Sequence, residues 1–99
     1  MHANVAKGRL HPDRIEDGVE LWRGSLLGDL RRHEGFKGMI LMGDRATGEN
    51  VSVTLWETEA HFRAAASDSG HRRAFSEIGP LYAGAPEFSN YEVFLREQG

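Results

Sequence analysis

The chain has 99 residues, 39% of them hydrophobic and 27% charged, and a formal net charge of −3. This length makes one domain, residues 1–99, with a modest core, because only about 60–65% of the unfolded surface is buried at this size. The acidic balance excludes a protein that holds nucleic acid through its phosphate backbone, and the absence of Cys excludes disulfides and thiolate chemistry.

The first third of the chain predicts a strand over residues 4–10 and then a long amphipathic helix. The helix opens at residues 11–13, where Pro fits the first turn, and Gly35 closes it. Its apolar residues recur at steps of three and four as far as about residue 33: Ile15, Val19, Trp22, Leu26 and Leu30. Gly24 and Gly28 inside it are either tolerated surface positions or points where another backbone or a ligand comes close.

A β-hairpin over residues 35–57 organises the fold. Residues 39–42 are apolar at four consecutive positions, which is typical of a strand covered on both faces. Gly48 suits the turn because glycine accepts a left-handed backbone. The second strand, residues 51–56, alternates strictly. One of its faces carries Val51, Val53 and Leu55, and the other carries Ser52, Thr54 and Trp56.

Two helical pieces and a strand complete the prediction: residues 60–66, 71–78 and 91–95. Thr58 is a suitable N-cap for the first piece, and either Asp68 or Ser69 could cap the second. Tyr91, Val93 and Leu95 alternate along the final strand.

The order strand, helix, strand, strand, helix, strand predicts an α+β fold. It is that of the ferredoxin-like βαββαβ plait, a four-stranded antiparallel sheet with both helices on one face. The strands supply apolar side chains for both faces of this sheet. A bare apolar face would be a larger patch than monomers expose, so we expect a homodimer whose sheets pack back to back, about 10 Å apart.

Several stretches point to a known family: Gly35-Phe36-x-Gly38, Thr47-Gly48, Thr54–Glu59 and Tyr91–Val93. Together they resemble the antibiotic biosynthesis monooxygenase-like domains of the dimeric α/β-barrel superfamily, over nearly the whole chain. The resemblance implies a homodimer whose two sheets form a barrel, and a pocket in each subunit between sheet and helices. The superfamily includes oxygenases, haem degraders and isomerases.

The resemblance also implies roles for single residues. Cofactor-independent oxygenases of polyketide anthrones carry a Trp at the position of Trp56, an Asn four residues before it and a Tyr six residues after it. Here those two partners are Ser52 and Phe62. Ser52 can donate a hydrogen bond, whereas Phe62 cannot carry a proton. In such enzymes the ionised substrate itself gives electrons to O₂, so the resemblance implies no cofactor.

The haem-degrading branch has a Trp nine positions beyond Trp56 and a haem-ligating His nine further on, where this chain has Ala65 and Ala74. We therefore expect no haem degradation by that chemistry, although His71 lies near the second position. The five His residues form no His-x-x-x-His pair, and we expect no metal site. Residues 71–73, His-Arg-Arg, are either a solvated surface or a cationic patch that attracts an acidic or phenolate ligand.

The two tryptophans also have alternative interpretations. Trp56 is either a pocket wall or a large core residue, because an indole buries much area in both cases. Trp22 lies on the apolar stripe of the first helix, which favours core packing.

Two hypotheses for the function follow. In the first, the protein is a cofactor-independent monooxygenase acting on a small planar aromatic or quinol-type metabolite. Trp56 and Ser52 are then catalytic, and the ligand is bound by Thr54, Phe62, Trp22 and His71. In the second, it is a non-catalytic dimer that binds a small ligand or is associated with stress.

Other partners are not expected. The element order is shared with the RNA-recognition motif, but the third strand lacks exposed aromatic residues and the chain is acidic. No segment has the length of a membrane span, and the first residues lack the apolar run of a signal peptide. We therefore expect a cytoplasmic protein that binds neither nucleic acid nor membranes.

Overall fold

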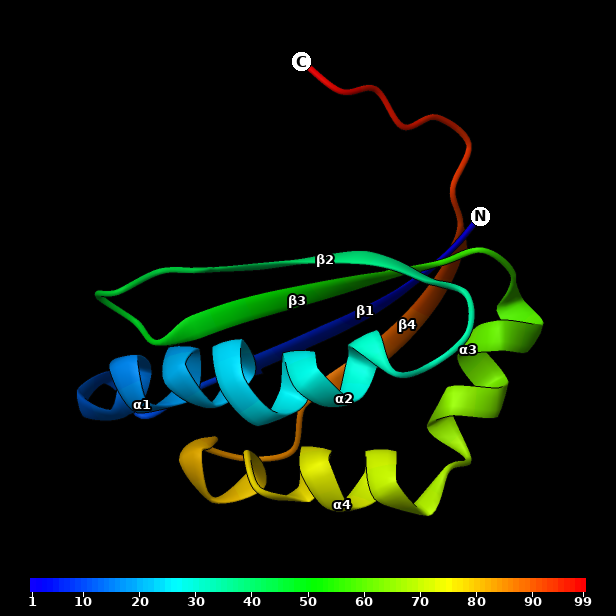
Figure 1. Ribbon diagram of the computed structural model, residues 1–99. Coiled ribbons are helices and arrows are strands. Elements are labelled where there is room, and N and C mark those ends of the chain that lie inside the picture. The colour runs from blue at the N-terminus through cyan, green and yellow to red at the C-terminus, as the bar shows by residue number, and fades with distance from the viewer.

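The computed structural model describes residues 1–99 and has an α+β architecture (Figure 1). Its strands are β1 (His2–Arg9), β2 (Phe36–Gly43), β3 (Glu49–Trp56) and β4 (Glu87–Glu92). They form one four-stranded antiparallel sheet in the order β2-β3-β1-β4. The helices lie on one face of this sheet and leave the other face open, as Figure 1 shows. The predicted ferredoxin-like plait is therefore confirmed.

The first helical segment is one continuous run. Its parts are η1 (Pro12–Arg14), α1 (Ile15–Leu21), η2 (Trp22–Leu26) and α2 (Leu27–Arg31). The η2 part is a π-helical turn, which widens the helix locally without breaking it. A Cβ added at Gly24 or Gly28 would meet no heavy atom within 4 Å. The interpretation of these two glycines as points of close approach is therefore wrong, and both are exposed surface positions.

The second helical segment has two parts, α3 (Glu59–Ala66) and α4 (Ser69–Ser76), followed by the 3-10 turn η3 (Gly79–Leu81). Thr58 caps α3 by accepting a hydrogen bond from the backbone N–H of His61. Asp68 caps α4 by accepting one from the backbone N–H of His71. Of the two residues that could cap the second piece, Asp68 is the cap, and the helix starts two residues earlier than predicted.

The final strand differs from the prediction. β4 ends at Glu92, whereas residues 91–95 were expected to be extended. Its partner is β1; the last paired residues are His2 and Glu92, and one further backbone hydrogen bond joins Val93 N to Met1 O at 2.9 Å. Phe94 and Leu95 follow in a tail where they are 91% and 82% exposed. The prediction that Leu95 belongs to a sheet face is therefore wrong.

The two faces of the sheet differ in chemistry. Side chains of residues paired across antiparallel strands lie on the same face. The helix side of β3 carries buried polar and aromatic residues: Asn50, Ser52, Thr54 and Trp56. The open side carries apolar residues: Val5, Ile40, Met42, Val51, Val53, Leu55 and Tyr91. Ile40, Met42 and Tyr91 are 54%, 49% and 57% exposed. The predicted apolar open face is confirmed.

The core lies between the helices and the inner face of the sheet. Trp56, Leu26 and Leu30 are its largest fully buried side chains, at 1%, 0% and 1% exposure. Helices of the first and second segments both contribute to this cluster. No helix in the structure combines the length and the apolar character needed to cross a bilayer.

The hairpin turn gives the first testable prediction. Gly48 has a φ of +81°, and a Cβ there would collide with the carbonyl oxygen of Leu10. Gly48→Ala should therefore lower the free energy of unfolding by at least about 1–2 kcal/mol. Gly28→Ala, at an exposed helical position with free space, should raise it by about 0.5–1 kcal/mol. Urea unfolding followed by circular dichroism measures both, and effects of the same sign would contradict this turn geometry.

Candidate functional site

A cavity of about 470 Å³ lies between the inner face of the sheet and the helices. All six residues that the sequence analysis placed at the ligand site line it: Trp22, Ser52, Thr54, Trp56, Phe62 and His71. Arg72, Phe88 and Asn90 also line it and are exposed, so the cavity opens between α4 and β4. Residues that are distant in sequence are thus gathered around one space by the packing of two helical segments on the sheet.

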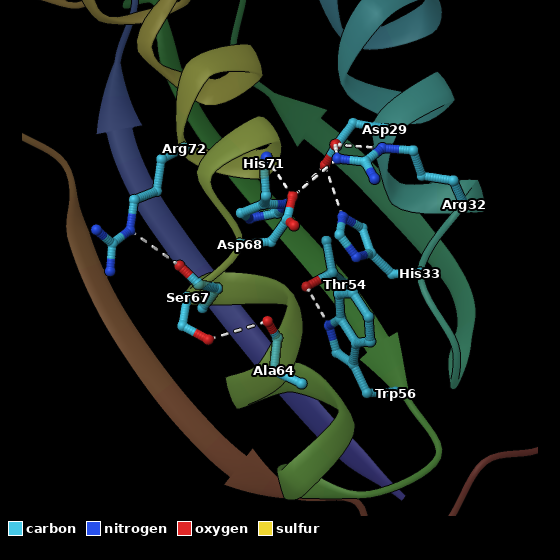
Figure 2. Close-up of polar contacts among 11 residues, drawn as sticks. Asp29, Arg32, His33, Thr54, Trp56, Ala64, Ser67, Asp68, His71 and Arg72 are labelled. Carbon is cyan, nitrogen blue, oxygen red and sulfur yellow. Dashed lines mark hydrogen bonds and ion pairs between the residues drawn. The ribbon is translucent and has the colours of Figure 1, made fainter.

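The inner face of β3 provides the polar wall. Thr54 Oγ1 accepts a hydrogen bond of 2.9 Å from Trp56 Nε1, which fixes the orientation of the indole (Figure 2). Ser52 is 4% exposed, and no hydrogen bond within the protein engages its hydroxyl. On the neighbouring strands, the amide of Asn4 donates to Asn90 Oδ1 at 3.1 Å. The face on which Asn4 lies was undetermined from the sequence, and it is the cavity face.

Aromatic side chains form the apolar wall. Trp56 contacts Phe36 and Phe62 edge-on, with ring centroids 5.5 and 5.9 Å apart. Trp56 belongs to the core and also lines the cavity, so it is both a large core residue and part of the pocket wall. Trp22 packs edge-on against Phe75 at 5.3 Å, and its predicted place in the core is confirmed. Its Nε1 is buried without a hydrogen-bond partner.

A polar network lies at the edge of the cavity (Figure 2). Its centre is Asp29, which is 7% exposed. Asp29 Oδ2 accepts hydrogen bonds from His71 Nδ1 at 2.7 Å and from His33 Nε2 at 3.2 Å. Arg32 donates to the other oxygen of Asp29 at 3.1 Å and pairs with Asp68 at 2.8 Å. The network therefore joins α2 to the N-terminus of α4.

Sequence analysis found only one member of this network, His71. Asp29 on α2 and His33 just beyond the end of that helix are four residues apart, and that spacing was the available signal. The contact between Asp29 and His71 spans 42 residues of sequence. No local pattern predicts such a contact, because it depends on how the two helical segments pack.

Two pKa values in the network are shifted. Burial raises the pKa of Asp29, but the hydrogen bonds and charges of His71, Arg32 and His33 outweigh burial and lower it below its usual value. Burial lowers the pKa of His71 below its usual value, although the hydrogen bond to Asp29 opposes this. Because the pKa of each group is lowered, Asp29 is an ionised carboxylate and His71 is a neutral imidazole at neutral pH. The neutral ring therefore donates its hydrogen bond to the carboxylate.

The same residues have the composition of a metal site. One atom each of Asp29, His33 and His71 lie within 4.8 Å of one another, a spacing that the ligands of a divalent cation can have. These atoms are hydrogen-bonded to one another through Asp29 Oδ2, and Arg32 occupies the second carboxylate oxygen. The network is thus satisfied by its own hydrogen bonds and by the guanidinium charge.

Comparison with known proteins shows the fold and no closer relationship. No family model matches the sequence, and no curated protein is similar to it in sequence. SnoaB, a cofactor-independent oxygenase from Streptomyces nogalater, is similar in structure with a TM-score of 0.77 and 17% identity, over 96% of this chain and 94% of that one. A structure described as an antibiotic biosynthesis monooxygenase has a TM-score of 0.76 and 17% identity, over 96% of this chain and 100% of its own.

A third similar structure is Rv0793 from Mycobacterium tuberculosis. It has a TM-score of 0.76 and 13% identity, and the match covers 98% of each chain. The fold expected from the resemblance to antibiotic biosynthesis monooxygenase-like domains is therefore confirmed over almost the whole chain. Identities this low carry no information about substrate or reaction.

The shifted pKa of His71 gives the second prediction. His71 has its usual pKa near 6.5 when unfolded and a lower one when folded, so below about pH 6.5 the unfolded chain binds more protons. The free energy of unfolding should therefore fall as the pH is lowered from about 7 to about 5. The lowered pKa of Asp29 also makes the free energy of unfolding fall with pH, but only at more acidic pH, below its usual pKa of 3.8.

Urea unfolding at a series of pH values measures this dependence. His71→Gln should have a smaller loss of stability between pH 7 and pH 5 than the wild type. His11→Gln is the matched control, because His11 is exposed and lies outside the cavity. An equal loss in both variants would contradict the assignment of this pH window to His71.

Proposed function

We propose that the protein is a cofactor-independent monooxygenase that acts on a small planar aromatic or quinol-type metabolite. The proposal rests on one observation: Trp56, Ser52, Thr54 and Phe62 line a single cavity that has an apolar wall and a polar wall. The cavity of about 470 Å³ lies within the range of small-molecule sites, roughly 300–1,000 Å³. A flat ring would lie against the aromatic wall while its oxygen atoms meet the polar strand face.

The chemistry needs little from the protein beyond binding and charge stabilisation. An anthrone-type CH₂ group loses a proton, and the resulting anion gives one electron to O₂. The substrate radical and superoxide combine to a peroxide, which loses its second C–H proton as the O–O bond breaks. The balance is R₂CH₂ + O₂ → R₂C=O + H₂O. Ser52 would donate a hydrogen bond to the substrate oxyanion, and Trp56, Phe62 and Trp22 would hold the ring.

We also propose that the active form is a homodimer with the open sheet faces packed together. The open face presents seven apolar side chains from all four strands, and monomers do not expose patches of this kind. Figure 1 shows the C-terminal tail rising on that same side of the sheet. Phe94 and Leu95 in the tail are 91% and 82% exposed, and a partner subunit would cover them.

The dimer gives the third prediction. Val53 lies at the centre of the open face, paired with both Val5 and Ile40. Val53→Asp would place a carboxylate in the dry interface and should weaken dimerisation at least about 100-fold. Sedimentation equilibrium at micromolar concentration measures it. Arg31→Gln, at an exposed position on the helix side, is the control with the same charge change of −1, and a monomeric wild type would overturn the proposal.

Oxygen uptake gives the fourth prediction. The wild type should consume O₂ with dithranol, a dihydroxyanthrone, faster than buffer alone. Trp56→Ala should abolish the excess rate by opening the aromatic wall. Ser52→Ala should lower it by about 10-fold through loss of one hydrogen bond to the anion. Ser69→Ala, at an exposed position outside the cavity, is the control.

Two results would contradict this assignment. Equal rates for the wild type and Trp56→Ala would remove the oxygenase proposal, once circular dichroism shows that both are folded. Saturable binding of dithranol without O₂ uptake would favour the alternative, a non-catalytic ligand-binding or stress-associated dimer.

A further inference from the structure

We propose that His71, positioned by Asp29, is the general base that takes a proton from the ligand in the cavity. The ligand is then a compound with an acidic O–H or a C–H flanked by a carbonyl, rather than any planar aromatic molecule. This inference rests on the proposed function for the location of the ligand. It supplies the proton acceptor that neither Phe62 nor Ser52 can provide.

The hydrogen bonds of the ring determine which nitrogen is available. His71 Nδ1 lies 2.7 Å from Asp29 Oδ2, so the neutral ring carries its proton on Nδ1 and donates to the carboxylate. Nε2 then keeps its lone pair, and no hydrogen bond within the protein engages it. The His71 side chain lines the cavity, and we place the bound proton donor against this nitrogen.

Asp29 is itself held in place, as Figure 2 shows. Arg32 contacts one carboxylate oxygen through Nε at 3.1 Å and Nη2 at 2.9 Å. His33 donates to the other oxygen at 3.2 Å. Asp68 accepts from both Arg32 and the backbone N–H of His71, at 2.8 and 2.9 Å. These contacts fix the ring of His71 relative to α2, which is the role of the acid in a histidine–carboxylate pair.

The charges around His71 suit a base that is neutral at rest. From the first helical segment it faces Asp29, Arg32 and His33, and from its own helix Asp68 and Arg72. Burial lowers the pKa of His71, while Asp29 and Asp68 oppose that shift. The ring is therefore unprotonated at neutral pH, and Asp29 beside it stabilises the imidazolium once a proton arrives.

The step balances without any other reactant. The ligand X–H gives its proton to His71 Nε2, and the bonding electron pair stays on the ligand as X⁻. The imidazolium then carries protons on both nitrogens, with Nδ1–H paired to the Asp29 carboxylate. Arg72, exposed at the opening of the cavity, contributes a positive charge that favours the anion. In the oxygenation reaction the same proton returns to the peroxide.

The fifth prediction tests proton transfer without oxygen. The probe is 4-nitrophenol, whose phenolate absorbs in the visible range, bound under nitrogen to the full-length protein. Wild-type protein should hold the probe as phenolate at a pH about one unit below the pH at which the free probe ionises. His71→Gln should lose most of this shift, because only Arg72 then favours the anion. Asp29→Asn, which keeps an oxygen acceptor but removes the charge, should lose most of it.

Controls separate this result from a structural effect and from the proposed function. His11→Gln should ionise the probe like the wild type, and a chelator should change nothing. The proposal is overturned if the wild type leaves the bound probe protonated, if His71→Gln ionises it equally, or if chelation abolishes the effect. With dithranol, His71→Gln should reduce kcat/KM for O₂ uptake by about 10²-fold or more. If the probe ionises but no protein form consumes O₂, the base assignment stands and the monooxygenase proposal fails.

Discussion

The alternation of strand β3 is the constraint on which the rest of the structure depends. In most two-layer α/β folds the helices cover the apolar face of the sheet. Here β3 turns Ser52 and Thr54 toward the helices and turns Val51, Val53 and Leu55 away from them. A shift of register by one residue would exchange these two faces. The pairing of β3 with β1 and β2 therefore determines which side chains face the helices and which face away from them. The polar inner face and the apolar outer face are consequences of one pattern.

The inner face explains why a cavity forms in a chain that has so little core. Buried polar groups must find partners, and several do so within the protein, as Thr54 and Trp56 do. The Nε1 of Trp22 does not, and the hydroxyl of Ser52, which lines the cavity, has no hydrogen bond within the protein. An apolar lining would favour closure of the space, whereas unpaired donors around it favour an occupant with oxygen acceptors. The outer face leads to the opposite conclusion, since its mainly apolar side chains are best covered by a second apolar surface.

The sequence was sufficient for the order of elements, for both faces of β3 and for the side chains that meet at the cavity. The elements and the two faces follow from periodicity, turn residues and caps, which act over a few residues, whereas the cavity was an expectation from the family resemblance. The sequence was insufficient where contacts between distant segments determine the end of an element or the surroundings of a side chain. The end of β4 depends on its pairing with β1, and the open space beside Gly28 depends on where the other elements pack. The partnership of Asp29 with His71 spans two helical segments, and only the i, i+4 spacing of Asp29 and His33 was visible in advance.

The buried carboxylate of Asp29 is difficult to explain by stability alone. Removing a charge from water costs several kcal/mol, and apolar side chains of similar volume usually stabilise a fold as well or better. Three residues around Asp29 supply the hydrogen bonds and charge that keep it ionised: Arg32, His33 and His71. His71 uses one nitrogen to bind Asp29 and leaves the other free in a side chain that lines the cavity, and this asymmetry is what a proton acceptor requires.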